Sequence, residues 1–348
     1  MGYGSTGTEV ETGPPVAART SRAGGGPRVA VVVVNYNTLG LVTDCLAALD
    51  RERAGGEQFT AVVVDNASPD GSGMQLPGAV FRGGWGEWAR VLALPDNRGF
   101  AAGNNTALRL LFTDPDPPDY VLLLNPDTVP RPGAVRRLRD FLDGNPRAGL
   151  AGSRLEDPDG TPHRAAFRFP GVASEFERGL RLGLVSKLLE PCVVAPPPAD
   201  RPHRADWLSG ASLMVRRQVF EQVGLMDEGF FLYFEETDLC RRARRAGWEC
   251  WHVPASRVVH LVGQSTGVTD RKKPPRRVPA YWLAARRRYF RKHLSPLAAT
   301  LADVAWAAGF AVWRVRRRVQ RKPDRDPPHA LADFVRVNFL APPAEVRP

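Results

Sequence analysis

One short stretch near the middle of the chain constrains the fold more than any other. Residues 121–124 are four consecutive apolar residues, followed at once by Asn125, Pro126 and Asp127. An apolar run without alternation is typical of a strand buried on both faces, as in a parallel sheet. Proline lacks the backbone N–H that a sheet ladder needs, so the strand must end there. The sequence therefore predicts that Asp127 lies at the carboxyl end of a central strand, where open α/β sheets bind ligands.

The position of Asp127 leaves two interpretations open. A carboxylate there is costly to bury unless it meets a cation or hydrogen-bond donors, which favours binding of a metal ion or a phosphate group. Alternatively, Asp127 belongs to a turn and only caps the helix that follows Pro132.

Three earlier apolar runs repeat the same pattern of a strand that ends in polar residues. Apolar residues at helical spacing follow most of them, so the first 150 residues predict a doubly wound α/β fold with three polar strand ends on one edge. Gly99 and Gly103 lie where a helix begins, so backbone N–H groups can approach an anion closely there. The three runs are residues 29–34, 61–64 and 91–94.

A second dense stretch joins an aromatic run to acidic residues. Residues 230–234 are Phe-Phe-Leu-Tyr-Phe, and Glu235, Glu236 and Asp238 follow in what we predict to be the first turn of a helix. Acidic residues are ordinary partners of the helix dipole there. However, a carboxylate beside apolar surface has a raised pKa and can act as a general base near neutral pH.

The segments between these stretches carry weaker signals. Residues 155–205 are rich in proline and arginine, and we predict an irregular excursion over one side of the site. Residues 207–215 are predicted to return to a strand, with small residues that let a bulky ligand lie against the backbone. His260 follows an apolar pair, and a lone histidine is more often structural than a ligand.

Composition excludes several classes of protein. With 43% hydrophobic and 24% charged residues, the chain is typical of a soluble globular protein. Its four cysteines lie far apart and form no C-x-x-C pair, which argues against a structural zinc site or a disulfide framework and indicates a reducing compartment. Residues 1–27 are predicted to be a disordered leader without a secretory apolar region, so we expect a cytoplasmic protein.

The net charge of +11 is unevenly distributed. Residues 271–348 contain 19 Lys and Arg against 5 Asp and Glu, whereas the preceding residues contain 29 against 32. A nucleic-acid enzyme more often carries its basic charge over its working cleft, so we expect no nucleic-acid partner. The basic excess instead predicts that the tail docks the protein onto another surface.

The tail combines this charge with an apolar helix. Residues 297–312 are apolar except for Thr300 and Asp303, and arginines follow directly. The run is shorter than the ~20 residues that span a bilayer. We therefore predict a helix on the inner face of the cell membrane, with Trp306 and Trp313 at headgroup depth and arginines on anionic lipid. The alternative is a helix packed on the protein or on a twin subunit in a homodimer.

Five motifs, taken together, resemble the inverting family 2 glycosyltransferases of the GT-A fold, and most closely their bacterial rhamnosyltransferase-like branch, which acts on polyprenyl-diphosphate sugars. The resemblance covers about residues 28–265. One motif alone would be weak, but five in the right order and spacing are specific. They are Val-Asn-Tyr-Asn at 34–37, Val-Asp-Asn-Ala-Ser at 64–68, Asn-Arg-Gly-Phe-Ala-Ala-Gly-Asn at 97–104, Asn-Pro-Asp at 125–127 and Phe-Glu-Glu-Thr-Asp-Leu at 234–239.

The resemblance implies a GT-A domain over residues 28–270, with a mostly parallel sheet, and a basic amphipathic helical tail over residues 271–348. It implies transfer of a sugar, best matched by L-rhamnose from dTDP-rhamnose, to a saccharide or lipid-linked acceptor, with Mg²⁺ or Mn²⁺ as cofactor. The implied nucleotide-binding residues are Asn35, Tyr36, Asn37, Asp65, Asn66, Arg98, Gly99, Asn104 and Asn125; the metal ligands are Asp127 and His260; Glu236 is the base, supported by Glu235 and Asp238; and Trp207 and Gly210 border the acceptor.

Two positions depart from the family pattern. The metal motif usually reads Asp-x-Asp, but its first position here is Asn125, so one charge is missing. The base motif usually reads Glu-Asp, but here it is Glu235-Glu236, and either could be the base.

Three alternatives remain. The donor could instead be a hexosaminyl, galactofuranosyl or mannosyl nucleotide. The chain could also be a non-catalytic module that binds sugar nucleotides, although the acidic cluster argues against this. An NAD-dependent dehydrogenase is disfavoured because no G-x-G-x-x-G follows the first strand.

Overall fold

The structure is a computed structural model, and it describes residues 28–261 and 275–340. The predicted leader over residues 1–27 lies outside the described residues, as do the first residues of the predicted tail.

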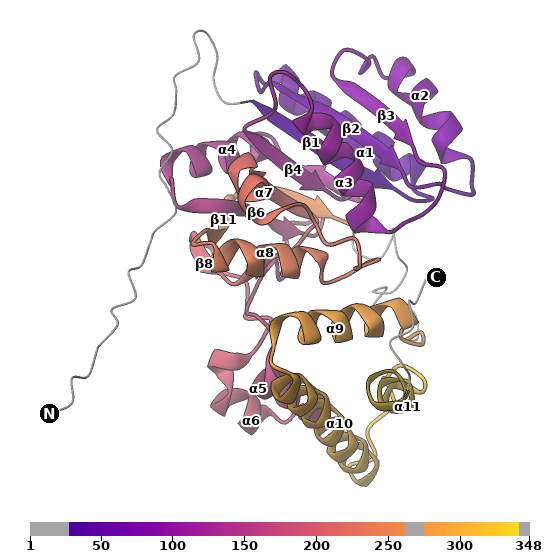
Figure 1. Ribbon diagram of the computed structural model, residues 1–348, viewed down its shortest axis with the longest axis vertical. Coiled ribbons are helices and arrows are strands. Elements are labelled where there is room, and N and C mark those ends of the chain that lie inside the picture. Colours follow the sequence, from indigo (N-terminus) through magenta and orange to yellow (C-terminus); the bar gives the residue numbers. More distant parts are fainter. Residues whose placement is uncertain (1–27, 262–274, 341–348) are drawn as a thin grey trace, which may run out of the picture.

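A mixed, largely parallel sheet forms the centre of the larger part of the molecule (Figure 1). Its strands follow the order β3-β2-β1-β4-β10-β6-β11-β5, and β8 pairs with β11 at one side. The first four of these strands are parallel, and β10 is antiparallel to both β4 and β6. The predicted fold class is therefore confirmed. The strands are β1 Val29–Asn35, β2 Phe59–Asp65, β3 Ala89–Ala93, β4 Tyr120–Leu124, β5 Thr128–Pro130, β6 Ala148–Glu156, β8 His203–Ala205, β10 Ser212–Arg216 and β11 Glu249–His260.

Helices cover both faces of this sheet, which explains why its central strands are apolar without alternation. Val31 and Val33 of β1 enter the core on one face, and Val32 and Val34 enter the core on the other. The first face is covered by α1 Leu39–Ala54, α2 Ser72–Arg82 and α4 Ala134–Gly144, and the second by α3 Phe100–Phe112, α7 Arg217–Val223 and α8 Glu235–Arg245.

The prediction that residues 155–205 are irregular is wrong. This segment contains two helices, and its strand β7 pairs with β9 in a small separate sheet. The buried residues of α5 are Ser174, Glu175, Gly179 and Leu180, which are mostly not apolar, so hydrophobic periodicity could not reveal the helix. The elements are β7 Ala166–Phe167, α5 Val172–Leu180, α6 Gly183–Leu188, the 3₁₀ turn Glu190–Cys192 and β9 Trp207–Leu208.

The helices of the tail form a second layer, in which α10 packs against α5 (Figure 1). The two backbones approach closely at Gly179 and Gly309: a Cβ on Gly309 would lie 2.9 Å from the Leu180 nitrogen. Beside this crossing Arg286 is fully buried and paired with Glu175. The tail comprises α9 Ala280–His293, α10 Pro296–Val319, α11 Ala330–Val335 and a π-helical turn Arg336–Leu340.

The two faces of α10 have different surroundings, one packed on protein and the other exposed. Trp306 stacks on Phe310 and packs on Phe334, with ring centroids 4.9 and 4.0 Å apart, and Trp313 donates a hydrogen bond to Asp326. Both tryptophans therefore contact protein on this face while remaining half-buried, and their place at headgroup depth stays a prediction. The opposite face exposes aliphatic side chains three or four residues apart, namely Leu297, Leu301, Val304, Ala308, Val312, Val315 and Val319.

Candidate active site

The first part of the site is built where β1 and β2 end. Asn35 and Asp65 are the last residues of these neighbouring strands and lie directly opposite each other. The amide of Asn35 donates to Asp65 Oδ1 over 2.7 Å, and the Ser68 hydroxyl donates to the same oxygen over 2.6 Å. Both residues are buried, whereas the next residue, Tyr36, is 41% exposed. Asn37 follows with a left-handed φ of 58°, so the chain turns sharply here.

A second loop lies at the same edge, before α3. Gly99 has a φ of 92°, and a Cβ there would collide with the carbonyl oxygen of Phe231. That carbonyl accepts a 2.7 Å hydrogen bond from Phe100 N, so the loop is joined directly to the aromatic segment before α8. The side chain of Asn66 donates to Asn97 and to the Gly99 carbonyl. Only a glycine at position 99 allows the backbone to lie this close to the Phe231 carbonyl.

The remaining residues of this loop are held by their neighbours. Asn104 is buried in α3 and donates to the Phe100 carbonyl. Arg98 is mostly exposed and pairs with Glu228 at 3.1 Å. Glu228 also binds Asn105 and Arg109. Glu228 could not be identified from the sequence, because a single acid in a loop carries no pattern that separates it from other surface acids.

Asp127 and His260 come together, although they are far apart in the sequence. Asp127 is buried, and its Oδ1 lies 3.4 Å from Nε2 of His260. The pairing of β5 with β11 places His260 opposite Thr128, and Leu261 N donates to the Asp127 carbonyl. Carboxylate and imidazole are both ligands of divalent transition metals, so this pair fits such an ion. Within residues 28–261 and 275–340 no third His, Cys, Asp or Glu joins them.

Glu235 and Glu236 open α8, directly after two residues with left-handed φ angles, Tyr233 and Phe234. Glu235 is buried, whereas Glu236 is partly accessible and lies over Gly210, where a Cβ would be 3.8 Å from its side chain. Burial raises the pKa of Glu236. Burial, with the charge of Glu236 beside it, raises the pKa of Glu235 well above its usual value.

The acids around positions 127 and 236 lie at the same end of the sheet. Strand β10 runs antiparallel to β4, so its beginning lies beside the end of β4. Asn125 N donates to the Ala211 carbonyl over 3.0 Å, next to the Gly210 that Glu236 covers. Trp207 lies nearby in β9, stacked on Phe167 at 4.1 Å, and its indole donates to the Arg168 carbonyl.

The largely parallel sheet with polar residues at its strand ends agrees with the GT-A fold that the sequence predicts. Residues 30–190 match the sequence profile of Glycosyl transferase family 2, and residues 120–320 match that of Glycosyl transferase family group 2. The chain belongs to glycosyl transferase family 2 and is a glycosyltransferase.

Three known proteins illustrate the similarity. N-acetylglucosaminyl-diphospho-decaprenol L-rhamnosyltransferase of Mycobacterium tuberculosis is 31% identical over 256 residues, which cover 68% of this chain and 77% of that protein. Rhamnosyltransferase WbbL of Escherichia coli is 27% identical over 47% of this chain and 60% of its own length. Mannosyltransferase PcManGT from Pyrobaculum calidifontis, solved with GDP-Man and Mn²⁺, shares the fold with a TM-score of 0.51 at 18% identity, covering 97% of this chain and 85% of that one.

Proposed function

We propose that the protein transfers L-rhamnose from dTDP-rhamnose to a hydroxyl of a polyprenyl-diphosphate-linked saccharide. The choice of rhamnose is supported by the names of the Mycobacterium tuberculosis and Escherichia coli relatives, and the lipid-linked acceptor by that of the former. The observation that supports transfer chemistry is the position of Glu236, over Gly210 and at the same end of the sheet as Asp127.

The side chains of this chain have distinct roles in the proposed reaction. Asn35, Asp65 and the loop around Gly99 bind the nucleotide. Glu236 accepts the proton of the acceptor hydroxyl, and its Oε2 has no hydrogen-bond partner among the described residues. The oxygen of the acceptor hydroxyl forms a bond to the anomeric carbon, while the bond from that carbon to the nucleoside diphosphate breaks on the opposite face. The anomeric configuration is thus inverted in one displacement.

Asp127 and His260 are the residues that would hold Mg²⁺ or Mn²⁺. Such an ion supplies positive charge that stabilises the leaving diphosphate. An imidazole ligand suits Mn²⁺ better than Mg²⁺, which prefers oxygen. Because the described residues provide one acid and one histidine here, the diphosphate and water would complete the shell.

A screen of sugar nucleotides tests the donor. We expect release of dTDP from dTDP-rhamnose when Mn²⁺ and an N-acetylglucosaminyl-diphospho-polyprenol are present, and none from UDP-GlcNAc, UDP-galactofuranose or GDP-mannose. Nucleotide release and lipid product would be measured together by mass spectrometry. Turnover of one of the other donors would overturn the rhamnosyl assignment. Donor binding without turnover of any sugar would favour a non-catalytic sugar-nucleotide-binding module.

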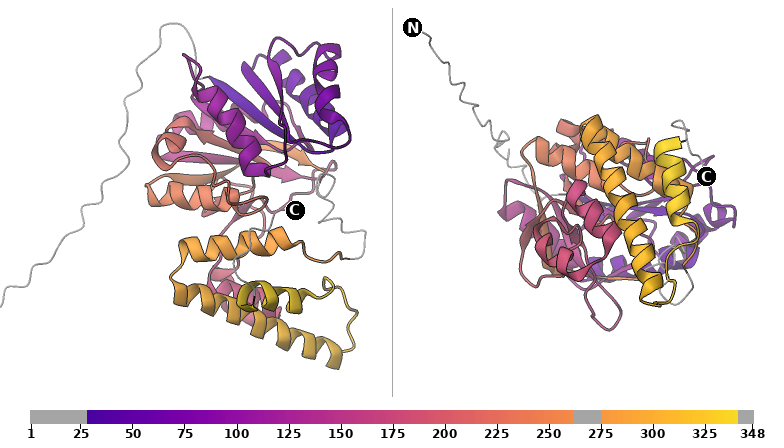
Figure 2. Two further views of the ribbon diagram at one scale, coloured as in Figure 1. Left: turned by 45° about the vertical axis from the view of Figure 1, so that its right-hand side comes forward. Right: turned by 90° about the horizontal axis from the view of Figure 1, so that it is seen from below.

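The exposed face of α10 supports a second proposal, that the tail binds an anionic membrane on the cytoplasmic side. Within the described residues α10 alone is long and apolar enough to cross a membrane, but one of its faces packs on α5. Its other face is aliphatic, and exposed Arg318 and Arg321 follow at its end. Figure 2 shows α5, α6, α10 and α11 gathered at one end of the molecule. These features suit a helix that lies on the membrane surface.

Charge placed on this face should release the protein from vesicles. We expect Val304→Glu with Val315→Glu to weaken binding to phosphatidylglycerol vesicles by at least about ten-fold, because two apolar contacts are lost and negative charge is added. Sedimentation with vesicles measures this. Phe81→Glu, at an even more exposed apolar position on α2, is the control. Unchanged vesicle binding would contradict this proposal. A wild-type dimer that the double variant dissociates would show that a twin subunit covers this face instead.

A further inference from the structure

The carboxylate of Asp238 lies on α8, two residues beyond Glu236. Residues two positions apart on a helix point about 200° apart, so Asp238 faces away from the side on which Glu236 lies. Its side chain is fully buried. A buried carboxylate is costly unless charged or polar donors compensate for lost water. Here those donors come largely from α9, a helix of the tail.

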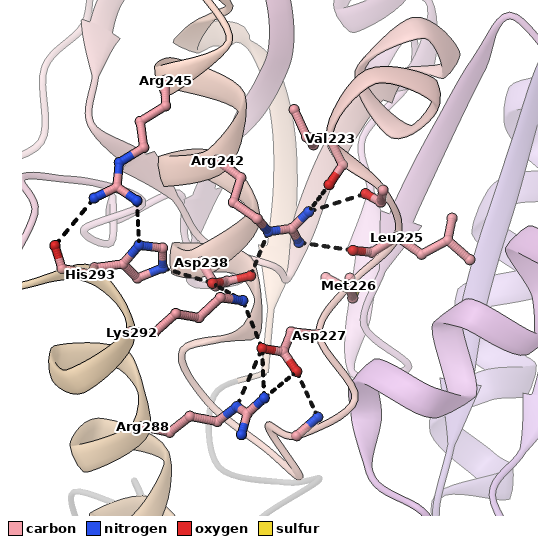
Figure 3. Close-up of polar contacts among 12 residues, drawn as sticks. Val223, Leu225, Met226, Asp227, Asp238, Arg242, Arg245, Arg288, Lys292 and His293 are labelled. Carbon is pink, nitrogen blue, oxygen red and sulfur yellow. Dashed lines mark hydrogen bonds and ion pairs between the residues drawn. The ribbon is translucent and has the colours of Figure 1, made fainter.

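His293 of α9 makes the most specific of these contacts (Figure 3). Its Nε2 lies 2.7 Å from Asp238 Oδ1, and its Nδ1 lies 3.2 Å from a guanidinium nitrogen of Arg245. An arginine can only donate, so Nδ1 must accept and Nε2 must carry the hydrogen. The imidazole thus contacts α8 twice, through Arg245 at one ring nitrogen and through Asp238 at the other.

Lys292 and Arg242 complete the cluster around Asp238. Lys292 Nζ lies 2.7 Å from Asp238 Oδ1, and Arg242 Nε lies 2.7 Å from Oδ2. Although burial opposes its ionisation, these partners together with His293 hold the pKa of Asp238 well below its usual range. Arg242 also donates to the carbonyl groups of Val223 and Leu225, which fixes α8 against the loop that precedes it.

Helix α9 also binds the segment that leads into α8. Lys292 and Arg288 both pair with Asp227, at 2.7 and 2.8 Å (Figure 3). The adjacent Glu228 pairs with Arg98 of the loop before α3. Residues 227 and 228 therefore connect α9 on one side with the proposed nucleotide-binding loop on the other.

The aromatic residues before Glu235 are also fixed by α9. Tyr281 stacks on Tyr233 with an angle of 13° between the ring planes, and Phe234 contacts Tyr289 with ring centroids 5.4 Å apart. Tyr233 and Phe234 have φ angles of 72° and 70°, a conformation that non-glycine residues adopt only when their surroundings impose it. The contacts with α9 supply such surroundings.

We propose that His293 and Lys292 of the tail are positioning residues for the transfer reaction, and that they hold the first turn of α8 so that Glu236 faces the acceptor hydroxyl. This inference rests on the proposed role of Glu236. Helix α9 would then support the active site, although its sequence lies in the basic tail.

Substitutions of His293 in the full-length chain test this proposal. His293→Phe keeps a ring against Tyr289, whose centroid is 4.9 Å away, but loses both hydrogen bonds. We expect kcat to fall by about 10- to 100-fold with the donor KM unchanged, because small displacements of a reacting group cost this much. His293→Gln retains a donor and an acceptor and should recover most of the rate. Arg291→Ala, at an exposed position on the same helix, should leave the rate unchanged.

Hydrogen exchange provides a readout that does not depend on the identity of the donor. In the free protein, amides 236–239 should exchange at least about ten-fold faster in His293→Phe than in the wild type or Arg291→Ala, since opening of the turn becomes easier. A His293→Phe protein with unchanged kcat and unchanged exchange at these amides would overturn the proposal. Faster exchange in a protein that transfers no sugar with any donor would contradict the proposed function but not the positioning role.

Discussion

Glu236→Gln is expected to lower kcat by about 10²–10⁴-fold while leaving the fold and donor affinity intact, because the amide cannot take a proton from the acceptor hydroxyl. Glutamine has nearly the same shape as glutamate, so contacts with Gly210 are kept. The measurements are single-turnover transfer with saturating donor and isothermal titration of the donor. A variant that turns over at a near-normal rate would remove Glu236 from the role of base.

Glu235→Gln is the matched control for this substitution. Glu235 is only 3% exposed, whereas Glu236 is less deeply buried and its side chain lies over Gly210. We therefore expect Glu235→Gln to lose far less activity than Glu236→Gln. The opposite order would assign the base to Glu235 and would place the acceptor beneath the aromatic segment.

The pH dependence of kcat provides a further check on Glu236. Burial raises the pKa of Glu236 above its ordinary value. The base works only when deprotonated, so kcat should fall as the pH decreases through this raised pKa, at a higher pH than for an exposed glutamate. The small residual rate of Glu236→Gln should lack this acidic limb. Rates would be measured at constant ionic strength after checking that the protein remains folded at each pH.

The core of the fold could be predicted from sequence because its strands have a strong local signal. The continuous apolar runs at residues 29–34 and 121–124 reflect burial on both faces, and the structure places both at the centre of the sheet. The helix α5 could not be predicted in this way. It is stabilised by a glycine contact with α10 and by the pairing of Glu175 with Arg286, more than 100 residues away, and neither produces a local pattern.

The site was partly readable for a similar reason. Polar residues at the end of a strand or just beyond it, such as Asp65 and Asp127, indicate a position at the sheet edge. Glu228 and His293 gave no such signal. His293 lies in a run of arginines and lysines that suggests a lipid-facing surface, and only the packing of α9 on α8 shows that its imidazole is turned inward toward Asp238.

Asp127→Asn is expected to reduce transfer by about 10²–10³-fold, the usual loss when one charged or polar group that stabilises developing charge is removed. The substitution keeps the shape of a buried side chain but removes its charge, and Asn125 already leaves the family's usual metal motif one acid short. We therefore expect Mn²⁺ to strengthen donor binding in the wild type and to do so much less in the variant. Titration of dTDP-rhamnose with and without Mn²⁺ measures this difference directly.

Two further variants distinguish metal binding from loss of structure. Asp159→Asn removes one negative charge from an exposed turn and should change neither rate nor metal dependence. Asn125→Asp restores the second acid and should tighten Mn²⁺ binding, because a carboxylate attracts a divalent cation more strongly than an amide does. If Asp127→Asn retained both its activity and its Mn²⁺-dependent donor affinity, the cation would have to be held elsewhere. Asp127 would then serve only as the partner of His260 at the sheet edge, since the start of α4 is bound by Glu52 and not by Asp127.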